Sequence, residues 1–427
     1  MSKYLLILLL ATIAFASNAQ LQGLANKVKN KVNQKVNQRV DAKIDRTIDK
    51  KLDEIEGKTP STENPSTASP DKPVKQEAGV VSFSRYDFVP GEKVLYAEDF
   101  AQEAIGELPI GWNSSGKGVV VTLDAIQGKW LKMYQNSFYL SSNTKSFEKN
   151  FTVEFDLLLQ FTYNNYTFPL LTFGLLSSNE LETTDNSLLI NPRQYKSAEI
   201  LLRPATNGWS QGGLFTALDK TEYFKSQDQK LAVLDANYNR IIHISMQAQE
   251  SRLRVWMNGE KIFDVPKALA TTYLFNQLFF KIHDSGYRED QLGFYISNVI
   301  VATGLPDTRH KLIEEGTFST TGILFDVNSA AIKPVSYGVL KEIATVLKEN
   351  PTVKIKIIGH TSSDGDDNAN MELSKKRASA VKAALIKEYA IDAAVLETDG
   401  KGETQPVADN RTKEGKVQNR RVEFIKL

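Results

Sequence analysis

The chain has 427 residues, 41% of them hydrophobic and 24% charged, an ordinary composition for a folded protein of two or three domains. Its formal net charge of +1 provides no overall field that would favour nucleic acid as a partner. It has no cysteine, so we expect no disulfide, thiolate metal site, cysteine nucleophile or lipid-bearing cysteine, and its 4 histidines show no metal-ligand spacing.

Residues 1–19 have the pattern of a secretory signal peptide. Lys3 precedes an apolar run over residues 4–15, and Ser17 and Ala19 supply small residues for cleavage after Ala19. A membrane anchor is the alternative, but the run is shorter than the roughly 20 residues that a spanning helix needs. We therefore predict an exported protein.

Residues 20–57 are predicted to form an amphipathic helical arm. An apolar residue recurs at every fourth position, which makes the apolar stripe wind around a helix of 3.6 residues per turn, and the first half of the arm is basic. A solvated spacer helix is one interpretation; self-association and contact with an anionic membrane surface are the others. Residues 58–80, rich in Pro, Ser and Thr, are predicted to be a semi-rigid linker.

Residues 81–303 show the period of two that is typical of strands. Apolar residues alternate with polar ones at 242–247, and the run 253–257 is followed by Asn258-Gly259 and a return strand over 260–265, which predicts a tight hairpin. Residues 129–133, 151–161 and 294–302 are also expected to be strands. A two-sheet β-sandwich is the expected fold.

Two segments of this region resemble concanavalin-like and laminin-G-like jelly rolls: Leu-Arg-Val-Trp-Met-Asn-Gly-Glu-Lys-Ile-Phe at 253–263 and Phe-Tyr-Ile-Ser-Asn-Val at 294–299. The resemblance implies a domain that binds a glycan or a protein. Aromatic side chains in a sandwich usually pack in the core. Of the four tryptophans, Trp112, Trp130, Trp209 and Trp256, only Trp256 is expected to be exposed, because it shares a face with Arg252 and Arg254.

Glu154 and Asp156 begin the Glu-x-Asp-x-x-Glu pattern of laminarinase-like glycosidases, but leucines occupy residues 157–159 and the second Glu is absent. Retaining hydrolysis needs two carboxyl groups about 5 Å apart in acid and nucleophile roles. We therefore interpret both residues as part of a polar strand face and expect no enzyme activity.

Residues 312–427 are predicted to form a β-α-β-α-β-β domain of the α+β class. The expected strands are Ile323–Asp326, Val353–Ile357, Leu396–Gly402 and Arg421–Ile425, and two amphipathic helices separate the first three. Arg377 lies in the apolar stripe of the second helix, between Leu373 and Val381. A guanidinium there either faces a cleft next to the Gly-rich, acidic loop 359–368 or forms an internal pair with an aspartate.

Five blocks in this region closely resemble the OmpA-like peptidoglycan-binding domain. They are Phe-Asp-Val-Asn-Ser-Ala-Ala-Ile at 325–332, Gly-His-Thr at 359–361, Asn-Met-Glu-Leu-Ser-Lys-Lys-Arg-Ala at 370–378, Gly-Lys-Gly-Glu at 400–403 and Asn-Arg-Arg-Val-Glu-Phe at 419–424. The whole layout is similar to OmpA-type envelope proteins of the Bacteroidetes.

The resemblance implies a site for the diaminopimelate of a peptidoglycan stem peptide. In the family an aspartate after Gly-His-Thr pairs with the ligand ammonium, and an arginine fifteen residues later takes a carboxylate. The arginine position is Arg377, whereas the aspartate position is Ser362, whose hydroxyl carries no charge; Asp364 is the candidate substitute. The implied site residues are Asn328, Thr361, Ser362, Asp364, Asn370, Leu373, Arg377 and Arg421, the last as a brace of the cleft.

These patterns predict a non-catalytic envelope protein of the periplasm or outer membrane that links peptidoglycan to the outer membrane or to a ligand-binding sandwich. The alternative is a periplasmic scaffold that binds a glycan or protein through the jelly roll and has a weakened wall module. Neither hypothesis requires a metal or another cofactor.

Overall fold

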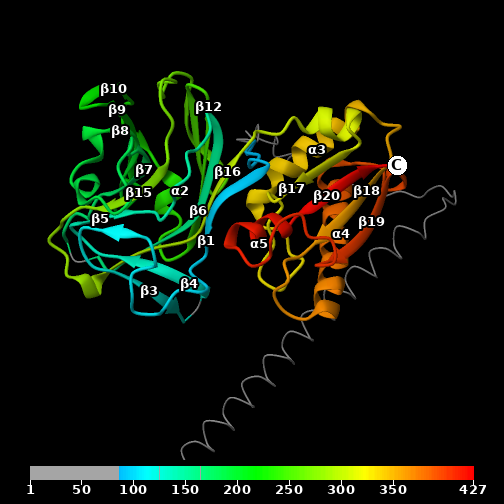
Figure 1. Ribbon diagram of the computed structural model, residues 1–427, viewed down its shortest axis with the longest axis horizontal. Helices are drawn as coiled ribbons and strands as arrows, with labels where there is room; N and C mark the ends of the chain where they lie inside the picture. The colour runs from blue at the N-terminus through cyan, green and yellow to red at the C-terminus, as the bar shows by residue number, and fades with distance from the viewer. Residues whose placement is uncertain (1–85, 125, 164) are drawn as a thin grey trace, which may run out of the picture. The chain divides into compact units, whose positions relative to one another are not determined.

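The structure is a computed structural model and describes residues 86–124, 126–163 and 165–427. The predicted signal peptide, helical arm and linker lie outside the described residues. The described chain forms two eight-stranded sheets followed by a four-stranded sheet. Figure 1 shows their elements in chain order, coloured from blue to red. None of its helices is long and apolar enough to cross a bilayer. A β-rich region followed by an α+β domain was the expected order.

The first sheet has the order β14-β13-β12-β6-β16-β4-β3, with β1 also paired to β16. Every pair in it is antiparallel. Its strands are β1 (Lys93–Glu98), β3 (Gly118–Leu123), β4 (Ile126–Met133), β6 (Asn150–Phe161), β12 (Ile241–Gln249), β13 (Arg252–Met257), β14 (Glu260–Val265) and β16 (Leu292–Thr303). The predicted strands at 129–133, 151–161, 242–247 and 294–302 are confirmed.

The second sheet is antiparallel as well and has the order β10-β9-β8-β7-β15-β5-β2, with β11 paired to β9. Its strands are β2 (Asn113–Ser114), β5 (Ser137–Leu140), β7 (Leu171–Ser177), β8 (Lys196–Arg203), β9 (Gln211–Leu218), β10 (Thr221–Lys225), β11 (Gln229–Lys230) and β15 (Gln277–Ile282). Short helical turns interrupt the connections: η1 (Asn186–Leu189), η2 (Pro192–Gln194), α2 (Ala232–Asp235) and η3 (Glu289–Gln291).

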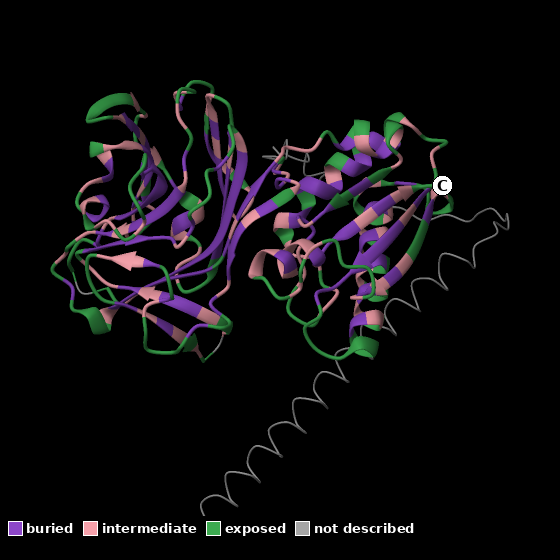
Figure 2. Ribbon diagram, viewed as in Figure 1, coloured by how far each residue is buried: buried purple, intermediate pink, exposed green. Residues whose placement is uncertain are grey.

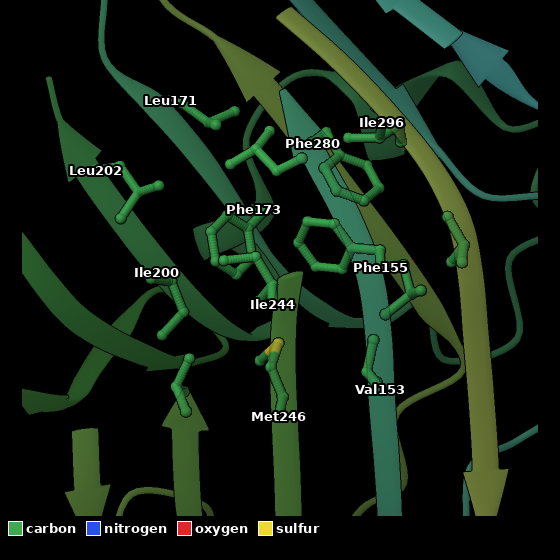
Figure 3. Packing of buried hydrophobic residues seen from close by; sticks show 14 of the residues in the cluster. Val153, Phe155, Leu171, Phe173, Ile200, Leu202, Ile244, Met246, Phe280 and Ile296 are labelled. Carbon is green, nitrogen blue, oxygen red and sulfur yellow. The ribbon is translucent and has the colours of Figure 1, made fainter. Parts of the chain in front are cut away.

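The apolar faces of these two sheets share one core. Phe155 of β6 meets Phe173 of β7 and Phe280 of β15 edge-on, with ring centroids 5.1 and 5.2 Å apart (Figure 3). Ile200 and Ile244 are also fully buried in this cluster. Central strands such as β6 and β16 are buried along most of their length (Figure 2). Burial of about 25 cal/mol per Å² of apolar surface makes this core the main source of the region's stability.

The predicted hairpin is confirmed, with Asn258 and Gly259 joining β13 to β14. Both residues have positive φ, +48° and +82°, the conformation that a two-residue turn with the twist of the strands requires. Asn258 tolerates the left-handed region better than most residues, and Gly259 has no Cβ to oppose it.

The expectation of an exposed Trp256 is wrong, because the segment before β1 covers its face of the sheet. Trp256 is 0% exposed, and the rings of Tyr86 and Phe88 meet it edge-on at 6.3 and 5.3 Å. Its Nε1 donates a hydrogen bond of 3.1 Å to Asp87. Trp209, at 74% exposure, is instead the exposed tryptophan.

Glu154 and Asp156 lie on a polar face of β6, opposite Ser245 and His243 of β12, and both are buried, with His243 between them. The imidazole Nδ1 lies 2.8 Å from Asp156 Oδ1, and Nε2 lies 3.2 Å from Glu154 Oε2. Burial alone would lower the pKa of His243, but the hydrogen bonds to the two carboxylates outweigh burial and raise it to about 9. The carboxylates are therefore partners of an imidazolium.

The C-terminal sheet has the order β17-β20-β18-β19, in which β18 and β19 are parallel and the other pairs antiparallel. Helix α4 packs against β18 and β19. The elements are η4 (His310–Glu314), β17 (Thr317–Thr320), η5 (Pro334–Ser336), α3 (Tyr337–Glu349), β18 (Ile355–His360), α4 (Asp367–Tyr389), η6 (Ala393–Val395), β19 (Leu396–Gly402), α5 (Lys413–Asn419) and β20 (Val422–Lys426).

The predicted strand at Ile323–Asp326 is wrong: the first strand of this sheet is β17, a few residues earlier. The stretch instead forms a local loop closed by the bridge between Phe325 and Ile332. Ser336 satisfies the Leu324 backbone through its hydroxyl, and Lys333 N donates to the Leu324 carbonyl at 2.8 Å. Because these groups satisfy its backbone, the stretch has no need of a sheet partner.

Candidate functional site

Arg377 lies in the apolar stripe of α4, as predicted, and its side chain reaches the loop before α3. Its Nε donates a hydrogen bond of 3.0 Å to the carbonyl of Ser329, and its guanidinium carbon lies 4.8 Å from the centre of the Phe325 ring. The helix that carries it begins at a well-formed cap, where the Asp366 carboxylate accepts from the backbone N–H of Ala369. These contacts fix the direction of the guanidinium.

The Arg377 guanidinium has no carboxylate partner in the described chain. No Asp or Glu oxygen of residues 86–427, apart from the two undescribed positions, lies within 4.0 Å of it. Burial lowers the pKa of Arg377, the nearby positive charge of Arg420 lowers it further, and the result is about 10. A partly buried cation without a counter-ion is poised to accept an anion, so the hypothesis of an internal Arg–Asp pair is not met.

The loop after β18 places Thr361 and Ser362 inside the domain, 5% and 4% exposed. The backbone N–H of Thr361 donates to the carbonyl of Gly402 at 2.9 Å, while its hydroxyl oxygen is buried without a partner. The Ser362 hydroxyl donates to Asp364 at 3.1 Å. The serine at the family's aspartate position is therefore a support for Asp364.

Asp364 already has a cation. Lys416 of α5 donates to its Oδ1 at 2.6 Å, and Arg420 lies 3.9 Å from its Oδ2. Burial alone would raise the pKa of Asp364, but the hydrogen bonds from Lys416 and Ser362 hold it below its usual value. A ligand ammonium that bound Asp364 would have to displace Lys416 from this carboxylate or share the carboxylate with it.

Asn370 connects the start of α4 to the surrounding loops. Its amide donates to Glu403 at 2.7 Å and to the carbonyl of Asp364 at 3.1 Å. Asn370 is 7% exposed, so these bonds hold the loop 361–366 in place rather than point to solvent.

The remaining predicted residues have different positions. Asn328 is exposed and has φ of +54°, in the loop whose Ser329 carbonyl holds Arg377. Leu373 is partly buried one helical turn before Arg377. Arg421 is buried, donates to the carbonyl of Gln405 at 3.2 Å and has a second terminal nitrogen without a partner. Burial lowers the pKa of Arg421.

Sequence reasoning missed Lys416 and Arg420, which link the two halves of the site. Arg420 influences Arg377 electrostatically and lies near Asp364, and Lys416 neutralises Asp364. Arg420 belongs to the Asn-Arg-Arg block that the sequence displays, so that block offered a signal for it. Nothing in the pattern around Lys416 indicates its partner. No group of three or more His, Asp or Glu side chains among the described residues could hold a metal ion.

Each of the following similarities to known proteins covers about a quarter of the chain. The sequence pattern of the OmpA family matches residues 324–420. Probable lipoprotein YiaD of Escherichia coli is 46% identical over 102 residues, which cover 24% of this chain and 46% of that protein. Outer membrane porin F of Pseudomonas aeruginosa is 41% identical over 101 residues, which cover 24% of this chain and 29% of that protein. The match thus spans less than half of each of these two relatives.

Two solved structures also match about a quarter of the chain. The cell wall anchor of the T6SS from Pseudomonas aeruginosa is 28% identical with a TM-score of 0.24, covering 26% of this chain and 80% of that chain. The peptidoglycan-associated lipoprotein from Burkholderia pseudomallei is 30% identical with a TM-score of 0.23, covering 26% of this chain and 89% of that chain. On the family pattern and the curated relatives, residues 324–420 form an OmpA family domain.

Proposed function

We propose that the C-terminal domain binds peptidoglycan without cutting it and that Arg377 takes a carboxylate of the stem peptide. The observation that carries this proposal is the unpaired, partly buried guanidinium. A planar guanidinium can bind a carboxylate through two parallel hydrogen bonds. The Nε–H of Arg377 is directed at Ser329, so the two terminal nitrogens are the donors for the ligand.

The ammonium of diaminopimelate would meet Asp364, beside Ser362 and Thr361. Since Lys416 already pairs with this carboxylate, the ammonium gains less here than at a free aspartate. Asn328, Asn370 and Leu373 are proposed to shape the ligand site, and Arg421 to brace it through the 405 carbonyl.

At the scale of the whole chain, we propose an exported protein of the periplasm or outer membrane. It would consist of a signal peptide (1–19), helical arm (20–57), linker (58–80), jelly-roll sandwich (81–303) and wall-binding domain (312–427). Relatives named as an outer membrane porin and a peptidoglycan-associated lipoprotein support the envelope location. The protein would link the wall to the outer membrane, through contacts of the arm, or to a ligand of the sandwich.

The ion pair between Asp364 and Lys416 favours one second candidate: a periplasmic scaffold that acts through its sandwich and has a weakened wall module. Sedimentation of the full chain with purified sacculi separates the two. We expect the wild type and Lys376→Ala to sediment, since Lys376 is exposed on the same helix. Arg377→Ala should bind at least about 10-fold more weakly, because a hydrogen bond to a charged group contributes about 1.5–3 kcal/mol. Equal sedimentation of wild type and Arg377→Ala would refute the role of Arg377, and no sedimentation of the wild type would favour the scaffold.

A further inference from the structure

The β-sandwich contains a cavity of about 410 Å³ that has no part in the wall-binding site. Its lining residues come from the end of β6, the β8–β9 loop and the segment from α2 to β12. Figure 1 shows where these strands and α2 lie in the sandwich. Ligand sites of small molecules occupy about 300–1,000 Å³, so this cavity suits a small ligand. Its lining residues include Phe161, Tyr163, Phe168, Asn207, Asp235 and Tyr238.

Aromatic rings form the apolar wall of the cavity. Phe161 and Phe168 stack with centroids 4.3 Å apart, and Tyr238 meets Phe161 edge-on at 5.3 Å. Tyr163 lies 6.2 Å from Phe168 and is 57% exposed, so part of its ring is available to a ligand. A site for a quaternary ammonium ligand would need several aromatic rings whose faces surround the cation. Phe161 and Phe168 instead stack on each other, so their facing sides are not available to a cation.

Polar groups also line the cavity, and they are held by the buried Ser210 hydroxyl. That oxygen lies 2.6 Å from Asp235 Oδ1 and 2.7 Å from the Tyr238 hydroxyl, which in turn donates to the Ala205 carbonyl at 2.9 Å. Asp235 Oδ2 is buried and accepts no hydrogen bond. This unmet acceptor is one that a ligand hydroxyl could satisfy after a small rotation of the carboxylate, whose terminal torsion is soft.

Two tight turns contribute to the lining of the cavity. Asn207, Gly208 and Asn239 have φ of +57°, +76° and +60°, the left-handed conformation of tight turns. The N–H of Asn239 donates to the Leu159 carbonyl at 2.8 Å, which ties its turn to β6.

We propose that this cavity binds one pyranose ring of a neutral glycan. The C–H face of a sugar packs on aromatic rings, while its hydroxyls donate to a carboxylate and exchange hydrogen bonds with amides and hydroxyls. Both kinds of group line this cavity, which also includes Asn207 and Asn239 beside Asp235. Trp209, 74% exposed and next to the lining residue Gly208, is available for a neighbouring sugar unit.

The test is isothermal titration calorimetry of the full chain with soluble hexasaccharides of glucose, mannose, xylose and N-acetylglucosamine, and with choline. We expect saturable binding of at least one hexasaccharide and no binding of choline. Asp235→Asn keeps an acceptor for Ser210 but replaces the unmet oxygen with a donor, and it should weaken binding at least 10-fold; Tyr163→Ala should do the same.

Tyr223→Ala is the matched control, because Tyr223 is an exposed aromatic residue of β10 that does not line the cavity. Its affinity should equal that of the wild type. Unchanged tryptophan fluorescence spectra show that each variant keeps its fold. The proposal is overturned if none of the four hexasaccharides binds, if choline binds in their place, or if both cavity variants bind as well as Tyr223→Ala.

Discussion

Replacing Arg377 by methionine should stabilise the C-terminal domain while it abolishes ligand binding. The folded domain holds the charged guanidinium in a partly buried position without a carboxylate partner among the described residues, and burial lowers its pKa from the ordinary value of arginine to about 10. A lowered pKa for a cation means that folding disfavours the charged form. The penalty is present at every pH below about 10 and disappears as the pH rises from there towards the ordinary pKa of arginine.

The size of the effect follows from opposing contributions. A tenfold change in proton affinity corresponds to about 1.4 kcal/mol, so the lowered pKa sets an upper limit of about 3 kcal/mol. Methionine forfeits the hydrogen bond to the Ser329 carbonyl and the contact with the Phe325 ring, each worth about 1 kcal/mol. Methionine has a helix propensity close to that of arginine. The expected net gain is about 1 kcal/mol.

Peptide-resolved hydrogen–deuterium exchange measures this gain within one domain of the full chain. Amides of α4 and β18 that exchange by unfolding of the domain should exchange about 5-fold more slowly in Arg377→Met, because 1 kcal/mol changes the folded-to-unfolded ratio by about that factor. Lys376→Met removes the same charge from an exposed position of α4 and should change exchange little. Faster exchange in Arg377→Met than in Lys376→Met would show that the guanidinium supports the fold, and would refute its interpretation as a free ligand group.

Three further changes probe other contacts. Lys416→Met should remove the ion pair with Asp364 and tighten diaminopimelate binding up to about 5-fold in calorimetry, since an exposed ion pair contributes about 0–1 kcal/mol. Weaker binding by this variant would mean that Lys416 itself contacts the ligand. The pKa of His243 is raised to about 9, so its charge should stabilise the sandwich in full below pH 6.5, and this contribution should be lost as the pH rises through 9. Urea unfolding followed by tryptophan fluorescence should show this decline in the free energy of unfolding. The variant His243→Gln should lack the decline. Gly359→Ala should destabilise the C-terminal domain by about 1–3 kcal/mol in the exchange assay, because a Cβ there would collide with the Ser374 carbonyl; wild-type exchange would contradict that packing.

Local sequence patterns predicted strands of the first sheet and of the C-terminal sheet, but they indicated no strand of the second sheet. The Asn258-Gly259 turn fixes its hairpin through backbone conformation alone, so two residues suffice to predict it. The apolar spacing of α3 likewise reports which side of that helix is buried, whereas β12 is buried on both faces despite its alternation at 242–247. The stretch 323–326 failed because a serine hydroxyl and a nearby N–H, rather than a neighbouring strand, satisfy its backbone.

Contacts between segments distant in sequence could not be predicted in this way. Trp256 shares a strand face with two arginines, and only the fold brings Tyr86 and Phe88 over it. The same holds for Asp364, whose partner Lys416 lies 52 positions away. The sequence displays both residues but gives no sign that they meet.

Buried charge is a signal of function only when its partners are known. His243 lies on the polar side of β12 and is nevertheless buried, and Arg377 is partly buried on α4. His243 is held between two carboxylates, and its pKa is raised, so its charge stabilises the fold. Arg377 has no carboxylate partner among the described residues, and its pKa is lowered, so its charge opposes folding until an anion arrives. An anion that pairs with Arg377 relieves this penalty as it binds, and the free energy stored against folding then contributes to affinity. His243 is thus a cation that its carboxylate partners hold within the fold, whereas the charge of Arg377 gains its partner from a ligand.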